Sequence, residues 1–238
     1  MRNKTKTLHS YKAIFSPVVF TLLLSSIFLP NFVQGQSANS QPRMLSESDL
    51  GKWERIGFRG TALSPDGKWL IYSITRNNRE NELRLHDISK NSLKVLKNSG
   101  SVSFSSDSKW LGVLISPNFK TTKALRKEKK PVRRTFELLN LTSGTSSKVK
   151  NISSFSFSAD GKFLVLNPYP PEKSKSKTSN IIVRNLVTGA DTIFGNVKDF
   201  AWSDKGSLLA AIVETEDEIG NGVKLFDGNT SVTLDSKE

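Results

Sequence analysis

Residues that carry out covalent or metal chemistry are scarce in this chain. The sequence has no cysteine and two histidines, His9 and His86. A zinc site is built from several Cys or His ligands, and a serine hydrolase places its nucleophile in a G-x-S-x-G turn with Asp and His partners. That pattern does not occur. We therefore expect no catalytic residue, no cofactor and no metal site on this chain.

The remaining candidates for chemistry have simpler interpretations. His86 is opposite in phase to Leu83 and Leu85 along an alternating strand, which is typical of a surface or interblade position. The Asp-Gly pairs lack the alternating acidic ligands of a calcium loop, and no phosphate-binding glycine pattern occurs. The acidic cluster 214–218 is interpreted as a solvated loop, with binding of the basic end of a substrate as the alternative.

Positive charge is concentrated in one segment. The formal net charge is +13, and residues 120–134 hold eight Lys or Arg against Glu128 alone. We interpret 118–134 as a solvated basic loop. The alternative is adhesion to membrane phosphates, whereas the absence of interleaved aromatic residues disfavours single-stranded nucleic acid. We expect no nucleic-acid partner.

The first 35 residues read as a signal peptide. A basic start without acidic residues precedes the apolar run 18–29, and a small-residue cleavage site follows at 33–35. The run has 12 residues, against the roughly 20 that a membrane helix needs. No later stretch is apolar enough to span a bilayer. The sequence thus predicts export to the periplasm or the extracellular space, without a membrane span.

Beyond this segment the chain is organised by a repeat. Four segments, beginning at residues 61, 102, 155 and 199, each contain a short apolar stretch, a serine, a turn and a second apolar stretch. The serines are 41, 53 and 45 residues apart, a period typical of four-stranded propeller blades. The repeat positions, interpreted as structural, are Ser64, Asp66, Gly67, Trp69, Ser105, Asp107, Trp110, Ser158, Asp160, Gly161, Phe163, Trp202, Ser203 and Gly206.

Each repeat also has a second half that reads as another hairpin, so the fold class we predict is all-β. The prediction is a partial β-propeller over 58–238 with about four blades of four antiparallel strands. A β-sandwich, the alternative, would not explain the internal period. A lead-in over 36–57 is expected to contain a short helix capped by Ser46 or Ser48, with Trp53 docked on the propeller. The expected blades are 58–98, 99–150, 151–196 and 197–236.

The segments LSESDLGKWERI, TALSPDGKWLIYSI and NRENELRLHDI resemble the amino-terminal region of secreted bacterial peptidases of the prolyl oligopeptidase family. The basic segment followed by FELLNLTSGTSSKV is similar to the second blade of that family. The resemblance covers about residues 44–235, and the combination of KWERI with ENEL is its most specific part. In that family a propeller precedes an α/β-hydrolase domain that carries the catalytic triad.

The resemblance implies a non-catalytic propeller portion of an exported serine peptidase. Such a propeller covers the active site and admits short peptides, which would be its ligands. The partners implied are the missing α/β-hydrolase domain and further blades, in the same chain or a separate one. None of the family's triad residues has a counterpart here. The alternative is a stand-alone periplasmic propeller that serves as a protein-interaction platform.

Overall fold

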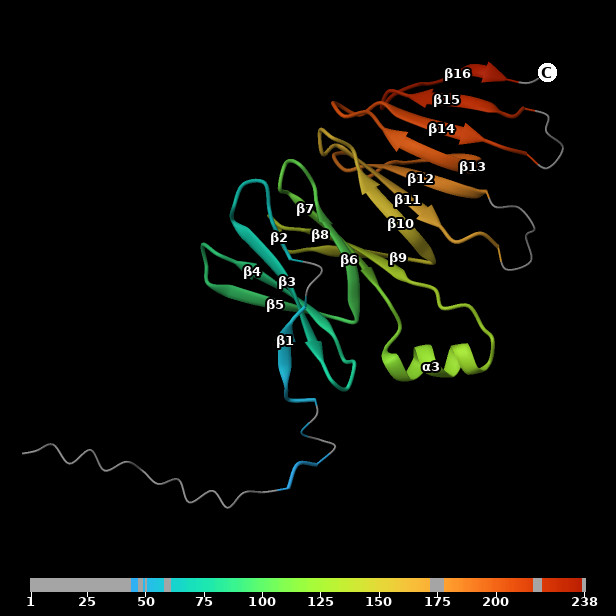
Figure 1. Cartoon of the computed structure of the whole chain (residues 1–238). Coiled ribbons are helices and arrows are strands. Elements are labelled where there is room, and N and C mark those ends of the chain that lie inside the picture. Colours follow the sequence, from blue (N-terminus) through green and yellow to red (C-terminus); the bar gives the residue numbers. More distant parts are fainter. Residues whose placement is uncertain are drawn as a thin grey trace, which may run out of the picture. The chain divides into compact units, whose positions relative to one another are not determined.

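Antiparallel strands are the main secondary structure in the part of the chain that the computed structural model describes, namely residues 44–46, 49, 51–57, 61–171, 178–215 and 220–236. The predicted signal peptide and half of the lead-in lie outside these residues. From Leu45 onward the chain forms one compact unit. Figure 1 shows its sheets succeeding one another in chain order.

The strands form three sheets. The first has the order β1-β3-β4-β5, and β2 also pairs with β3. Its strands are β1 (Glu54–Ile56), β2 (Ala62–Leu63), β3 (Trp69–Arg76), β4 (Glu82–Asp87) and β5 (Ser92–Lys97). The second sheet consists of β6 (Ser99–Phe104), β7 (Trp110–Ile115), β8 (Thr135–Asn140) and β9 (Ser146–Lys150).

The third sheet has seven strands because one strand serves two repeats. It consists of β10 (Ile152–Phe157), β11 (Phe163–Pro168), β12 (Ser179–Asn185), β13 (Asp191–Trp202), β14 (Leu209–Val213), β15 (Gly222–Phe226) and β16 (Ser231–Ser236). The first part of β13 pairs with β12 and the last part with β14, and both pairings shift register next to Val197. A register shift of this kind turns a strand without ending it, so repeats 3 and 4 share β13.

We number the repeats 1 (β2–β5), 2 (β6–β9), 3 (β10 to the first part of β13) and 4 (the last part of β13 to β16). The hydrophobic core is divided into three clusters, and each one joins two successive repeats. In the first pair, Ile71 and Leu85 of repeat 1 pack with Leu111 and Val113 of repeat 2. The second cluster joins repeats 2 and 3, and the third joins repeats 3 and 4.

The second strand of an inner repeat contributes to two clusters at once. In β11, Phe163 and Val165 belong to the cluster with repeat 4, whereas Leu164 and Leu166 belong to the cluster with repeat 2. Alternate side chains of a strand point to opposite faces of the sheet. The continuous apolar run in this strand is therefore the consequence of burial on both faces.

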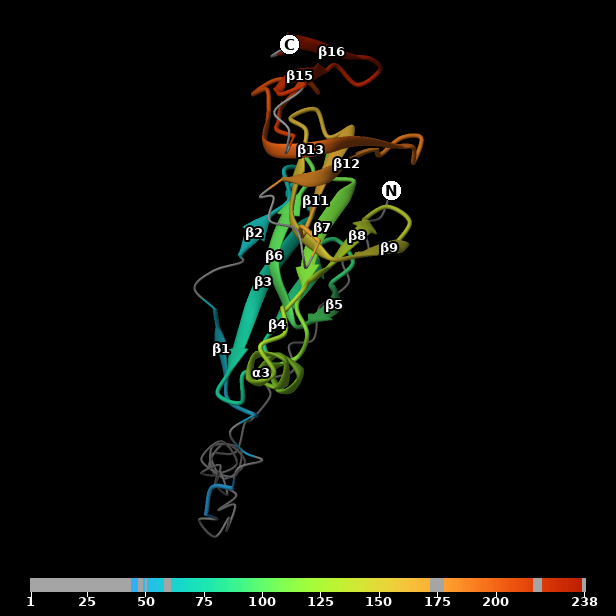
Figure 2. The same ribbon diagram turned by 90° about the vertical axis from the view of Figure 1, so that its right-hand side faces the viewer.

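The basic segment differs from the loop we predicted. It contains helix α3 (Phe119–Lys127), which begins after its N-cap residue Asn118 and has no buried residue. The Asn118 side chain accepts a hydrogen bond from the Thr121 N–H at 2.8 Å, which satisfies one free donor of the first turn. The helix lies beyond the ends of β7 and β8 (Figures 1 and 2), so its charges stay in water without packing against a sheet.

The prediction of an all-β, partial β-propeller is confirmed, since successive antiparallel sheets pack in chain order and are not closed.

In the lead-in, Ser46 N–H and Oγ both donate to the Asp49 carboxylate, at 3.0 and 2.8 Å. Trp53, which we expected to dock on the propeller, is 47% exposed. Among the described residues, no helix is long and apolar enough to cross a bilayer.

Candidate functional site

The repeat residues singled out in the sequence lie in the turns between the first and second strand of each repeat. In repeat 2, Ser105 Oγ donates to the Asp107 carboxylate at 2.6 Å and accepts from the Trp110 N–H at 3.0 Å. The same two bonds occur in repeat 1 through Ser64, Asp66 and Trp69, and in repeat 3 through Ser158, Asp160 and Phe163. These three serines are buried, so the motif is a structural turn.

A left-handed residue closes each of these turns. The position is occupied by Gly67, Ser108, Gly161 and Gly206, with φ between 58° and 74°. Successive turns also touch, because the Asp66 N–H donates to Ser108 Oγ at 3.0 Å and the Asp160 N–H donates to the Gly206 carbonyl at 3.2 Å. Ser108 thus replaces the usual glycine and joins two repeats.

The fourth turn departs from the other three. Lys205 takes the place of the aspartate, and Ser203 Oγ donates to its carbonyl at 2.5 Å. Trp202, which precedes this serine, packs 6.5 Å from the Phe163 ring and donates its indole N–H to the Ser156 carbonyl at 3.4 Å. The structure therefore uses Trp202 to attach repeat 4 to repeat 3.

A second repeated feature was missed by the sequence reasoning. Asn98, Asn151 and Asn196 have positive φ and stand at the junctions between repeats. The carbonyl of each accepts a hydrogen bond from an N–H located 18 residues later, in Ser116, Tyr169 and Glu214. Each asparagine precedes an anchor serine by seven residues. That spacing would have identified the junctions, because Asn tolerates the left-handed region better than most residues.

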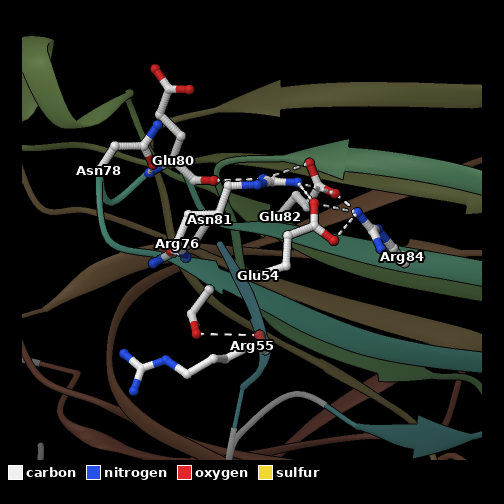
Figure 3. A network of polar contacts seen from close by, with 9 residues as sticks. Glu54, Arg55, Arg76, Asn78, Glu80, Asn81, Glu82 and Arg84 are labelled. Atoms are coloured by element: carbon white, nitrogen blue, oxygen red, sulfur yellow. Dashed lines mark hydrogen bonds and ion pairs between the residues drawn. The ribbon is translucent and has the colours of Figure 1, made fainter. Parts of the chain in front are cut away.

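The only described cluster of two carboxylates with two guanidinium groups joins the lead-in to repeat 1 (Figure 3). Glu54 of β1 lies opposite Arg76 of β3 in the strand pairing. Arg76 donates to Glu54 at 2.5 Å and to Glu82 at 3.0 Å. Arg84 donates to both oxygens of Glu54 at 2.8 Å and to Glu82 at 2.9 Å. We call these four residues the ion cluster.

The ion cluster holds all four of its groups in their charged forms. Hydrogen bonds from Arg76 are the main cause of the lowered pKa of both Glu54 and Glu82, and burial opposes the shift. The same bonds, to Glu82 first and Glu54 second, raise the pKa of Arg76. Burial alone would lower the pKa of Arg84, but its bonds to the two glutamates raise it overall. The groups neutralise one another, so none is poised to exchange a proton near neutral pH.

A polar cleft of about 370 Å³ lies beside the ion cluster. Its walls come from the lead-in, the β3–β4 loop, the junction after β5 and the N-cap of α3. They contain two cations, two carboxylates and three amides. The lining residues are Gly51, Arg76, Glu80, Asn81, Glu82, Lys97, Asn98 and Asn118. Such a surface can hold a polar or zwitterionic group by hydrogen bonds and ion pairs.

The other candidate residues show no catalytic geometry. His86 Nε2 lies 3.1 Å from Asn91 Oδ1, on the exposed side of its strand. Among the described residues, no group of three or more acidic or histidine side chains could hold a metal ion. Residues 216–218 of the acidic cluster lie outside the described residues, while Glu214 at its start pairs with Lys198 at 2.5 Å.

Arg76 and Arg84 were not identified from the sequence, although the glutamates that they bind belong to the KWERI and ENEL segments. Glu54 and Glu82 are 28 residues apart in the chain, and the β1–β3 register brings them together. A partial signal was present, because Glu82 and Arg84 are two residues apart and point to the same face of a strand. The position of Arg76 depends on the loop between β3 and β4 and could not be read from spacing.

Comparison with known proteins supports the fold. No family model matches the sequence, and no curated protein matches it. Among solved structures, the chain is similar to the β-propeller domain of the trilobed protease from Pyrococcus furiosus, with a TM-score of 0.50 and 13% identity, covering 79% of this chain and 59% of that one. The acylaminoacyl peptidase of Pyrococcus horikoshii follows with a TM-score of 0.47 and 14% identity, over 82% of this chain and 34% of that one.

A putative 6-phosphogluconolactonase from Bacteroides fragilis also matches, with a TM-score of 0.37, 14% identity and coverage of 80% of this chain and 58% of that one. At these identities the likeness establishes a propeller fold and leaves the activity undetermined. The chain spans 59% of the trilobed protease domain and 34% of the acylaminoacyl peptidase.

Proposed function

We propose that this chain is the propeller portion of an exported serine peptidase of the prolyl oligopeptidase type. In this role the propeller covers the active site of an α/β-hydrolase domain and admits short peptides. The chain contributes walls and contacts to that assembly, whereas the nucleophile and its base come from the hydrolase domain. This division agrees with the absence of a G-x-S-x-G segment from the sequence.

The observation that carries the proposal is the ion cluster. KWERI and ENEL are the segments with the most specific resemblance to the peptidase family, and each supplies one glutamate to the cluster. Arg76 and Arg84 bind both glutamates, so the two segments form one structural unit. A resemblance that arose by chance would not be expected to select residues that meet in space.

The outer face of repeat 4 supports the view that the chain is one portion of a larger propeller. Leu208, Ile212 and Val232 are 42%, 44% and 58% exposed. Between them lie Ala210 and Leu225, which are paired across β14 and β15. In repeats 1 to 3, the same positions of the second strand face the following repeat. A further blade is the partner that this pattern fits.

The experiment examines the protein in its source cells. An antibody against residues 45–236 is used to isolate the protein from envelope and secreted fractions, which are then treated with a fluorophosphonate probe that labels active serine hydrolases. We expect a labelled hydrolase domain, either in the same polypeptide or in a tightly bound second chain. The purified chain alone should hydrolyse no peptide or ester above background.

Two results would overturn the proposal. The first is stoichiometric labelling of the isolated chain itself, which would reveal a nucleophile that we do not identify. The second is recovery of a stable chain of this length with no labelled hydrolase attached under any condition. That second outcome would favour the stand-alone propeller that acts as an interaction platform.

A further inference from the structure

Helix α3 carries a density of positive charge that the proposed peptidase role does not use. Residues 119–134 contain eight Lys or Arg and a single acidic residue, Glu128. That glutamate pairs with Lys130 at 2.8 Å, which leaves the lysines of the helix without a described carboxylate partner. Like charges this close repel one another, so the segment gains from any surface of opposite charge.

The basic segment 119–134 is held in place at both ends, at the start of α3 and just before β8. On one side, the Arg79 guanidinium lies 4.9 Å from the centre of the Phe119 ring, which joins α3 to the β3–β4 loop of repeat 1. On the other side, Arg134 Nε donates to the Tyr169 hydroxyl of repeat 3 at 3.0 Å. A segment anchored to two repeats presents its charges in fixed positions.

One face of α3 collects the lysines. Lys120, Lys123 and Lys127 follow the i, i+3, i+7 spacing of a single helical face, and all three are exposed. Thr122 and Leu125 on the opposite side are half-buried. A helix of nine residues is marginal on its own, and this one buries no residue. The fold therefore does not require the lysine face for packing.

We propose that this lysine face docks the protein onto the anionic lipid headgroups of a membrane. The charges match, and the three lysines form one row on a convex helix, which suits an extended flat surface better than a small ligand. Phe119 lies beside the row and is 40% exposed, and an aromatic ring next to lysines is suited to the headgroup layer. Nucleic acid fits less well, because the row has no interleaved aromatic side chains for base stacking.

The test is sedimentation of the purified chain with lipid vesicles. Vesicles of phosphatidylcholine with about one third phosphatidylglycerol should bind the chain, and vesicles of phosphatidylcholine alone should not. Each lysine near an anionic surface strengthens binding roughly fivefold. The K120Q/K123Q/K127Q variant should therefore bind roughly one hundredfold more weakly, and added salt should release the unmodified chain.

A matched variant separates this face from net charge. Lys68, Lys109 and Lys162 lie in the turns at the opposite ends of the strands and pair only weakly with neighbouring aspartates, at 3.3 to 3.7 Å. The K68Q/K109Q/K162Q variant loses the same charge and should bind as the unmodified chain does. An arginine version, K120R/K123R/K127R, should also bind.

Three results would overturn the proposal: no binding to the anionic vesicles, an equal loss in both glutamine variants, or tighter binding of the chain to duplex DNA than to the anionic vesicles at the same salt concentration. Thermal melts show whether each variant is folded. If the triple glutamine variant fails to fold, vesicle binding is compared between the arginine variant and the single Lys123→Gln variant. The outcome does not depend on the peptidase proposal, since vesicle binding requires no hydrolase domain.

Discussion

Repeats 3 and 4 use the same type of second strand in different surroundings. In β11, residues Phe163–Leu166 are all buried, because repeat 2 covers one face and repeat 4 covers the other. In β14, Leu209 and Ala211 are 1% and 2% exposed, whereas Ile212 and the preceding residue Leu208 are 44% and 42% exposed. Both strands are apolar on both faces, yet only one of them is covered on both.

The difference shows what an apolar strand pattern specifies. The pattern defines a strand that can be buried on two faces, but the presence of a neighbouring repeat decides whether burial occurs. Scattered apolar residues are normal on a protein surface, while a contiguous row across neighbouring strands indicates an interface. Repeat 4 therefore has the sequence of an inner blade and the exposure of an end blade.

The largest difference in unfolding free energy should come from replacing one leucine by alanine in each of these two repeats. We expect Leu164→Ala to cost about 2–5 kcal/mol of unfolding free energy, because the fully buried side chain leaves a cavity between repeats 2 and 3. Leu208→Ala should cost less than about 1 kcal/mol, since the side chain is largely in water. Urea unfolding of both variants measures the difference. Equal losses would mean that the Leu208 face is covered in solution.

Association of the isolated chain tests the uncovered face directly. We expect the chain to self-associate or aggregate at tens of micromolar. The exposed apolar face of repeat 4 and the edge strand β16 can both bind another copy of the chain. Ile212→Lys combined with Val232→Lys should shift the protein toward monomer in sedimentation velocity. A chain that is monomeric and melts cooperatively without these substitutions would contradict the view of an incomplete propeller.

The turns of the same two repeats should differ less strongly. Ser158 is buried, accepts from the Phe163 N–H at 2.9 Å and donates to Asp160 at 2.7 Å. Ser158→Ala leaves that N–H unsatisfied and should cost about 1–3 kcal/mol. Ser203→Ala should cost less than about 1 kcal/mol, because Ser203 makes one described side-chain bond in a partly exposed turn. Thermal melts of both variants provide the comparison.

The smallest expected effect is the pH dependence that comes from the turn aspartate of repeat 3, Asp160. Burial would raise the pKa of Asp160, but hydrogen bonds from Ser158 and the Lys162 N–H lower it overall. A carboxyl with a lowered pKa in the folded state stabilises the fold above its unfolded pKa, and this stability is lost as the pH falls through the folded value.

Asp160→Ala should therefore be less stable than the unmodified chain near pH 7, and the difference should shrink in acid below the usual aspartate range. Asp204→Ala in the fourth turn is the control, because the buried serine–aspartate bond is absent there. The melting temperatures of the unmodified chain and of each variant, at neutral and at acidic pH, measure both differences. A gap for Asp160→Ala that stays constant with pH would count against this role of its carboxylate.

Several features were predictable because they depend on short-range chemistry. The turn serines, the aspartates two residues later and the glycines at positive φ follow from local hydrogen bonding and steric limits. Helix α3 was missed because it has no apolar stripe, and its clearest local signal is the N-cap Asn118. The sharing of β13 by repeats 3 and 4 was not predicted, because the register shifts next to Val197 that keep both ladders paired depend on strand pairing.

Local sequence thus accounts for the repeat period, the strand character and the turn geometry, since each depends on residues a few positions apart. The pairing of Glu54 with Arg76 and Arg84, the two anchors of α3 and the exposure of Leu208 and Ile212 arise only in the folded chain. These features join residues that are distant in sequence, and their energies depend on strand register and on which face has a neighbour. Strand register and the presence of a neighbouring repeat are set by the packing of whole sheets, so no short segment of the sequence predicts them.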